Sequence, residues 1–270
     1  MYIKDGHIHS PYCPHGTTDP FEKYIKKAIH LGYNEMTFTE HAPLPKGFKD
    51  PVPQMDSAMS LEQLEFYFQA VKELQVKYEK IIKINVGLEI DFIEGFEEET
   101  EQLLNKWGHE LDDAILSVHF LKCSRANRYI CLDYSPSAFE SLIDEYSTLE
   151  GVYEKYYRTI ELSITSNLGK YKPNRIGHIT LVRKFQRRFP RSFDDSHYII
   201  NTLNSVNDRG LTLDINGAGL LKPLCREFYP PLEWVKMAAS IGIPLVYGSD
   251  AHSAEQLGEG LEEFYNLINY

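Results

Sequence analysis

Short apolar runs that end in polar residues recur along the chain, with helix-type patterns between them. Seven of these runs predict β-strands: 2–7, 35–40, 82–90, 114–119, 175–178, 211–216 and 243–248. The intervening stretches include 61–78, where apolar residues recur every three or four positions, the spacing of one helix face. This alternation predicts an α/β fold built from parallel β/α units.

Parallel β/α units can form either an open doubly wound sheet or a closed barrel. An open sheet usually gathers its ligand residues at one crevice, whereas a barrel draws them from the carboxyl ends of many strands. Polar residues of catalytic type follow nearly every predicted strand in this chain. We therefore expect a barrel, formed by a single domain that spans residues 1–270.

Two long segments interrupt the alternation of strands and helices. Residues 42–59 contain four prolines with little periodicity, and residues 122–137 form a second long connection. Loops of this length in a compact domain are usually functional. We expect both segments to be loops near the site rather than domain boundaries, because the alternation resumes on either side of each.

The composition is that of an ordinary globular chain, with 43% apolar and 25% charged residues. No apolar run is long enough for a membrane span, and the first residues do not resemble a signal peptide. A net charge of −11 argues against a general nucleic-acid binder. The four cysteines show no C-x-x-C spacing, which indicates reduced thiols. We expect a cytoplasmic domain that binds neither nucleic acid nor membranes, of unknown oligomeric state.

The histidines indicate where the chemistry lies. His7 and His9 end a predicted strand, and side chains two positions apart on a strand point the same way, so both imidazoles can bind one ion. Glu89 and Asp250 end apolar strands, where a buried carboxylate needs a cation or hydrogen bonds to compensate it. The potential metal ligands at or after strand ends are His7, His9, His15, His41, Glu89, His119, His178, Asp250 and His252.

Nine potential ligands are too many for one ion, so the sequence predicts two or three divalent metal ions. Imidazole and carboxylate groups bind zinc, iron and manganese alike, so the metal cannot be named. The histidines His30, His109 and His197 lie inside helical patterns and are expected to be ordinary surface residues.

The same strand ends, taken in order, resemble the motifs of the polymerase-and-histidinol-phosphatase (PHP) superfamily of metal-dependent phosphoesterases. The resemblance extends from residue 5 to residue 252 and implies a distorted (β/α)7 barrel that forms one PHP-type catalytic domain. The matching strings are Asp5-Gly-His7-Ile-His9-Ser10, Thr39-Glu40-His41, Gly87-Leu88-Glu89, Ser117-Val118-His119, Gly177-His178 and Gly248-Ser249-Asp250-Ala251-His252.

Several longer strings are similar to the histidinol-phosphatase members of this superfamily, among them Glu40-His41-Ala-Pro-Leu-Pro45 and Arg175-Ile-Gly-His178. This resemblance implies a phosphatase that hydrolyses L-histidinol phosphate to L-histidinol in histidine biosynthesis. It also implies three metal sites. The first would be held by His7, His9, Glu89 and Asp250, the second by Glu89, His119 and His178, and the third by His15, His41 and His252.

Such a site would act on a small phosphate ester. Phosphate monoesters resist attack by water because they are nearly dianionic, so a hydrolase must neutralise charge and supply hydroxide. We expect in-line attack by a hydroxide that bridges the first two metals. The residues expected to take part in catalysis are Glu89, Asp250 and His252, although the sequence does not decide which group protonates the leaving alkoxide.

Three basic residues are candidates for contacting the phosphate: Arg175, Arg183 and Lys222. Arg175 lies three residues before a potential ligand. Relatives commonly have an arginine directly after Ala-Gly-Leu, where this chain has Leu221, so Lys222 is the candidate to supply that charge. Each of the three is equally compatible with a surface charge.

Other functions remain open at this stage. A PHP phosphoesterase acting on a nucleotide, an oligonucleotide or phosphotyrosine would use the same ligands, but the longer strings favour the small imidazole substrate. A metal-dependent binding module without activity is disfavoured by the complete ligand set. A metal-dependent amidohydrolase is disfavoured by the order of the motifs.

Overall fold

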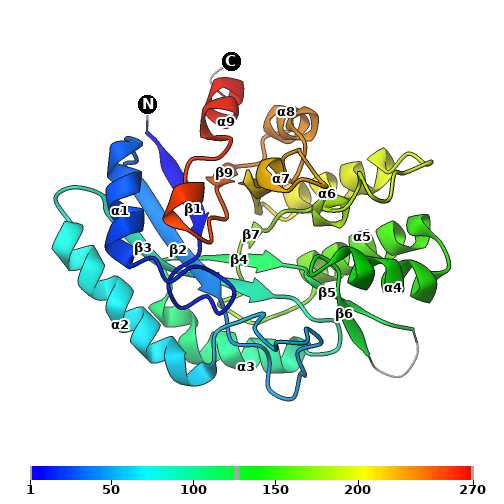
Figure 1. Ribbon diagram of the computed structural model, residues 1–270, viewed down its shortest axis with the longest axis horizontal. Coiled ribbons are helices and arrows are strands. Elements are labelled where there is room, and N and C mark those ends of the chain that lie inside the picture. Colours follow the sequence, from blue (N-terminus) through cyan, green and yellow to red (C-terminus); the bar gives the residue numbers. More distant parts are fainter. Residues whose placement is uncertain (1, 125–127, 269–270) are drawn as a thin grey trace.

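A computed structural model of the protein describes residues 2–124 and 128–268. One parallel sheet contains all seven of the predicted strands, in the order of the chain (Figure 1). These strands are β1 (Lys4–Ile8), β2 (Glu35–His41), β3 (Lys83–Asp91), β4 (Asp113–Ser117), β7 (Arg175–Ile176), β8 (Thr212–Asn216) and β9 (Leu245–Gly248). All seven predicted strands are confirmed, although β7 has only two residues.

The first and last strands of the sheet meet. Ile8 pairs in parallel with Ala251, and two backbone hydrogen bonds join the segments, from Asp250 N–H to His7 O (2.8 Å) and from His9 N–H to Ala251 O (3.0 Å). The sheet is therefore a nearly closed barrel, and the predicted distorted (β/α)7 fold is confirmed. The distortion lies in the short β7 and in a register shift of β1 between Asp5 and Ile8.

Helices surround the strands of the barrel (Figure 1). They are α1 (Phe21–His30), α2 (Leu61–Tyr78), α3 (Glu97–Trp107), α4 (Pro136–Tyr146), α5 (Leu149–Thr165), α6 (Ser196–Asp208), the one-turn α7 (Ala218–Leu221), α8 (Leu232–Ser240) and α9 (Leu261–Ile268). Helix α2 buries the apolar face that its spacing predicts, including Leu64, Phe68 and Val71. Ser60 begins it, and the Ser60 N–H donates to Gln63 Oε1 at 3.1 Å, which supplies a partner for a backbone amide at the helix start.

The segment 122–137 is not a plain loop. Strands β5 (Phe120–Lys122) and β6 (Tyr129–Cys131) pair antiparallel, while residues 125–127 lie outside the described residues. Strands of three residues are too short for an alternating pattern to predict. The rings of Phe120 and Tyr129 each lie 5.1 Å from the ring of Phe48, so this hairpin packs against the 42–59 segment.

The two long segments also meet through a hydrogen bond. The Tyr134 hydroxyl donates to Gln54 Oε1 at 2.8 Å. Residues of both segments, including Val52, Asp56, Cys131 and Asp133, line the same cavity. The tertiary structure therefore places both segments beside one site.

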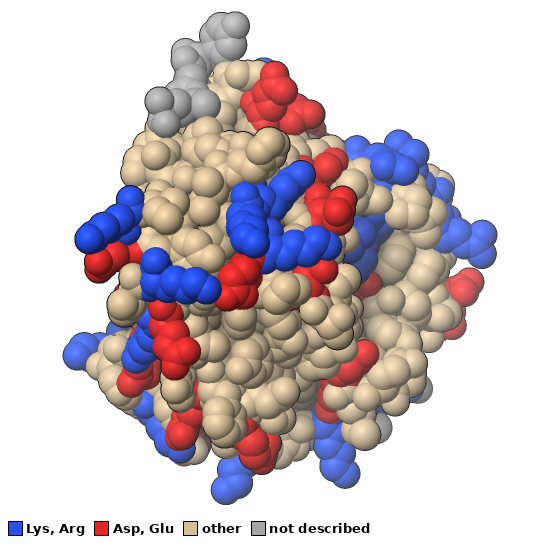
Figure 2. All heavy atoms as spheres, turned by 60° about the vertical axis from the view of Figure 1, so that its left-hand side comes forward, with Lys and Arg blue, Asp and Glu red and all other residues tan. Residues whose placement is uncertain are grey.

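The surface carries charges of both signs. On the face shown in Figure 2, lysine and arginine side chains alternate with aspartate and glutamate side chains. Within residues 2–124 and 128–268, no helix combines the length and the apolar character that crossing a membrane requires.

Candidate metal centre

The nine predicted ligands converge at the carboxyl ends of the barrel strands. Seven of them line a cavity of about 420 Å³: His15, His41, Glu89, His119, His178, Asp250 and His252. His7 and His9 are fully buried beside them. The convergence follows from the fold, because the carboxyl ends of parallel strands lie at the same end of a barrel.

Glu89 lies between two groups of histidines. Its Oε2 atom is 3.4 Å from His7 Nε2 and 3.5 Å from His9 Nε2. Its Oε1 atom is 2.9 Å from His178 Nε2 and 3.7 Å from His119 Nε2. One carboxylate oxygen therefore faces each group, the arrangement that a carboxylate bridging two cations requires.

Asp250 completes the first group. Its Oδ1 atom lies 3.0 Å from His9 Nε2 and 3.6 Å from His7 Nε2, and Asn216 Nδ2 donates to its Oδ2 atom at 3.1 Å. The backbone of Asp250 has a φ of 50°, in the left-handed region that residues other than glycine rarely adopt. Such strain is typically kept where it serves a functional site.

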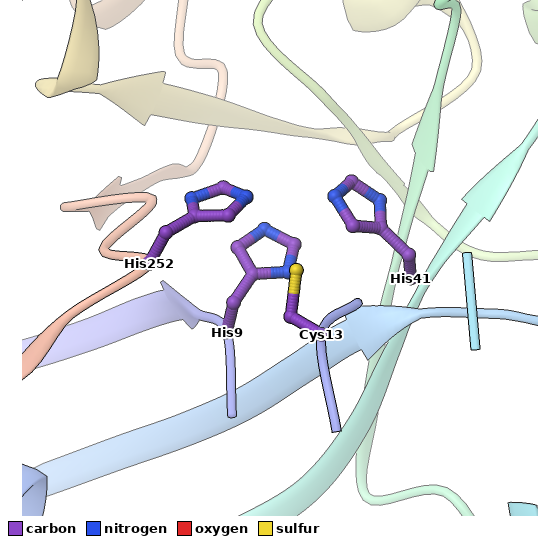
Figure 3. A group of neighbouring side chains, drawn as sticks. All are labelled: His9, Cys13, His41 and His252. Atoms are coloured by element: carbon purple, nitrogen blue, oxygen red, sulfur yellow. The ribbon is translucent and has the colours of Figure 1, made fainter. Parts of the chain in front are cut away.

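A third group lies beside the first. The rings of His41 and His252 approach His9 and the thiol of Cys13, and the ligand atoms of these four residues all lie within 4.8 Å of one another (Figure 3). His15 joins from the loop after β1, with its Nε2 atom 3.2 Å from His252 Nε2. Cys13 was not among the predicted ligands, and its only signal in the sequence is its position two residues before His15.

Most of these rings have a polar partner on their Nδ1 atom. His7 Nδ1 lies 3.1 Å from Asp214, His9 Nδ1 3.2 Å from Glu40, and His119 Nδ1 2.7 Å from Asp91. His15 Nδ1 lies 2.7 Å from the backbone oxygen of Asp56, and His252 Nδ1 3.0 Å from that of Asp250. Partners of this kind fix the ring orientation of metal-binding histidines.

The ring nitrogens that lack a hydrogen-bond partner indicate whether the site suits metal ions. Among the described residues, His7 Nε2 and His9 Nε2 are buried and have no hydrogen-bond partner. Burial acts to raise the pKa of Glu89, but His7, His119 and His41 outweigh it and hold that pKa well below its usual range. Unpaired imidazole nitrogens around ionised carboxylates are the donor set that divalent metals bind. The cluster is therefore able to bind metal.

The structure differs from the expected phosphate contacts at Arg175 and Arg183. Arg175 begins β7, is 1% exposed, and donates to Asp113 and to the Gly6 carbonyl, both at 2.8 Å. Arg183 donates to both carboxylate oxygens of Asp195. Neither arginine lines the cavity, because buried carboxylates hold both guanidinium groups elsewhere. In this structure the two guanidinium groups form ion pairs with Asp113 and Asp195, and their contact with a phosphate stays a prediction.

Two lysines, in contrast, lie at the cavity. Lys222, the predicted candidate for contacting the phosphate, lines it, and Lys184, which was not among the candidates, lines it as well. Lys184 Nζ lies 2.9 Å from Asp133 Oδ2. Burial lowers the pKa of the Lys222 ammonium, and neighbouring Lys184 lowers it further.

The variant Asp91→Asn tests whether the carboxylates that contact the histidine rings contribute to metal binding. The amide keeps the shape of the side chain but removes the charge beside His119 Nδ1, so we expect metal affinity at the second group to fall about 10- to 100-fold. Competitive titration with a chelator measures this affinity. Asp113→Asn is the matched control at the opposite end of the neighbouring strand. Equal affinity in the wild type and Asp91→Asn would contradict the role of Asp91.

Comparisons with known proteins agree with this geometry. Residues 5–218 match the PHP domain family. The histidinol-phosphatase of Bacillus subtilis is 44% identical over 266 residues, which cover 98% of each chain. A protein of Deinococcus radiodurans named probable histidinol-phosphatase is 34% identical over 254 residues, which cover 94% of this chain and 88% of that one.

Two solved structures share the fold. A candidate histidinol phosphatase from Listeria monocytogenes superposes with a TM-score of 0.92 at 35% identity, over 97% of this chain and 99% of that one. The histidinol phosphate phosphatase of Lactococcus lactis, crystallised with zinc, L-histidinol and phosphate, gives a TM-score of 0.71 at 21% identity, over 99% and 92%. At that identity the second likeness shows the fold alone.

Proposed function

The chain belongs to the PHP domain family, and from this premise we propose that it is a metal-dependent phosphatase that hydrolyses L-histidinol phosphate to L-histidinol and phosphate in histidine biosynthesis. The observation that carries the proposal is the position of Glu89, with one carboxylate oxygen toward each of two histidine groups. The whole-length similarity to the Bacillus subtilis histidinol-phosphatase supports this substrate. We assign residues 1–270 to one PHP-type catalytic domain.

We assign the nine converging side chains to three metal sites. The first comprises His7, His9, Glu89 and Asp250, the second Glu89, His119 and His178, and the third His15, His41 and His252. The separate clustering of the first two sets of ligand atoms supports the first two assignments. The contact between His15 and His252 supports the third. The ligand types suit zinc, iron or manganese.

Divalent ions in these sites would supply positive charge and a bound water of lowered pKa at neutral pH. The protein contributes the shape and charge of the cavity around them. The Lys222 ammonium lines the cavity and can bind a phosphoryl oxygen. Asp250 and His252 lie at the same cavity and are our candidates for delivering a proton to the leaving alcohol.

A substrate panel tests this function. Metal-replete protein should release phosphate from L-histidinol phosphate with a kcat/KM at least about 100-fold above that for 3′-phosphorylated nucleotides or phosphotyrosine, a difference of about 2.7 kcal/mol. A chelator should abolish the activity, and zinc, iron(II) or manganese should restore it. Preference for a nucleotide would assign the chain to a different phosphoesterase activity. Absence of phosphate release with each metal would favour a binding module.

A further inference from the structure

The cavity contains a negative charge that neither the metal sites nor their partners use. Five carboxylates line it: Asp56, Glu89, Asp91, Asp133 and Asp250. Glu89 and Asp250 belong to the proposed metal sites, and Asp91 is bound to His119 Nδ1 at 2.7 Å. Asp133 and Asp56 are the two that remain for contact with a substrate.

The Asp133 carboxylate is held in place by two contacts, and part of its hydrogen-bond acceptor capacity is unused. Its Oδ2 atom accepts from Lys184 Nζ at 2.9 Å, and its Oδ1 atom accepts from Cys131 Sγ at 3.3 Å. The side chain is 18% exposed. Because a carboxylate offers about four acceptor positions, these two contacts leave room for a further donor from the cavity.

Asp133 also lies close to the second histidine group. The neighbouring Leu132 N–H donates to the carbonyl oxygen of His119 at 2.9 Å, which ties this segment to the metal centre. Burial acts to raise the pKa of Asp133, but Lys184 and His119 hold it below its usual range. The group is therefore an anion at neutral pH, in the cavity that His119 and Lys222 also line.

The proposed substrate needs such an anion. L-histidinol phosphate has an ammonium group on the carbon next to its phosphate-bearing CH2, so the ammonium necessarily lies close to the phosphoryl group. Metal ions that attract the phosphate repel that ammonium. Buried charges are costly unless they are paired, so the cavity must supply a carboxylate within a few ångströms of the metals.

We propose that Asp133 binds the ammonium group of the substrate and so selects amino-alcohol phosphates, with Lys184 holding the carboxylate in position. This inference rests on the function proposed above and names how that site recognises its substrate. Asp133 lies in the turn two residues after β6 ends, whereas Asp56 lies within the 42–59 segment. With two side-chain contacts of its own and a neighbour whose backbone is bonded to His119, Asp133 is the better preorganised of the two.

The test compares L-histidinol phosphate with its analogue that lacks the amine, 3-(imidazol-4-yl)propyl phosphate. Wild-type protein should prefer the amine substrate by about 100-fold in kcat/KM, because the analogue cannot form the charged hydrogen bond to Asp133. In Asp133→Asn, kcat/KM should fall about 100-fold for the amine substrate and less than about 3-fold for the analogue. Asp56→Asn is the matched control and should keep the wild-type ratio.

Each other outcome is informative. An equal loss on both substrates in Asp133→Asn would show that Asp133 only positions Lys184, and would overturn the proposal. A changed ratio in Asp56→Asn would assign the ammonium to Asp56 instead. The wild-type comparison needs no variant to fold, and equal turnover of both substrates there removes this inference alone. Turnover of neither, with activity on another phosphate ester, removes the proposed function as well.

Discussion

Glu89→Gln is expected to lower kcat/KM for L-histidinol phosphate at least about 1,000-fold, which corresponds to about 4 kcal/mol of transition-state stabilisation. Glu89 faces both histidine groups, with Oε2 toward His9 and Oε1 toward His178. The amide has the same shape but lacks the charge and one of the two acceptor oxygens. Both of the first two sites should therefore lose affinity together.

Elemental analysis of the purified variant measures this directly, as metal ions per chain, beside steady-state kinetics. Glu35→Gln is the matched control, because Glu35 is also a buried glutamate but lies at the start of β2, at the other end of the barrel, paired with Lys4. The control should keep the wild-type metal content. Near-normal turnover of Glu89→Gln, or loss of only one ion, would contradict a bridging role for Glu89.

His9→Ala is expected to abolish phosphatase turnover while the protein stays folded. His9 Nε2 lies 3.0 Å from Asp250 Oδ1 and 3.5 Å from Glu89 Oε2, so its removal takes one nitrogen from the first site. His119 and His178 lie on the other side of Glu89, so the second site should keep its ion. His9→Ala should lose one metal ion, whereas Glu89→Gln should lose affinity at both sites. This difference distinguishes a ligand of one metal site from a ligand shared by two.

The test measures the metal content and turnover of His9→Ala. A circular dichroism spectrum like that of the wild type shows that the variant is folded. His109→Ala is the control, since His109 is more than half exposed and lies before the amino end of β4, whereas His119 follows the carboxyl end of that strand. Near-normal turnover of His9→Ala with unchanged metal content would refute the role of His9.

The partners of the histidines fix the orientation of the rings in the site. Asp214, Glu40 and Asp91 each lie within 3.2 Å of a ring nitrogen, so each ring presents its other nitrogen toward Glu89 or the cavity. Histidines held in this way already have the ring orientation that metal binding requires. The barrel thus supplies a preorganised centre rather than a set of mobile ligands.

The sequence by itself determined the seven strands and the residues that follow them. Strand ends such as those at His7, Glu89 and Asp250 are local features, and parallel strands bring their carboxyl ends together whatever the details of packing. The fold class and the convergence of the predicted ligands follow from those two facts. The assignment of individual ligands to metal sites stays a prediction.

Only the tertiary structure decided which distant groups meet. His7 and Asp214 are 207 positions apart, and no local pattern indicates their contact. Arg175 and Arg183 looked available for a phosphate, but carboxylates from other elements hold them away from the cavity, whereas Lys184 and Asp133 line it. A charged side chain pairs with whichever opposite charge lies near it in the folded protein, and that neighbour can be distant in the sequence. The role of each charged side chain therefore depends on how the elements pack.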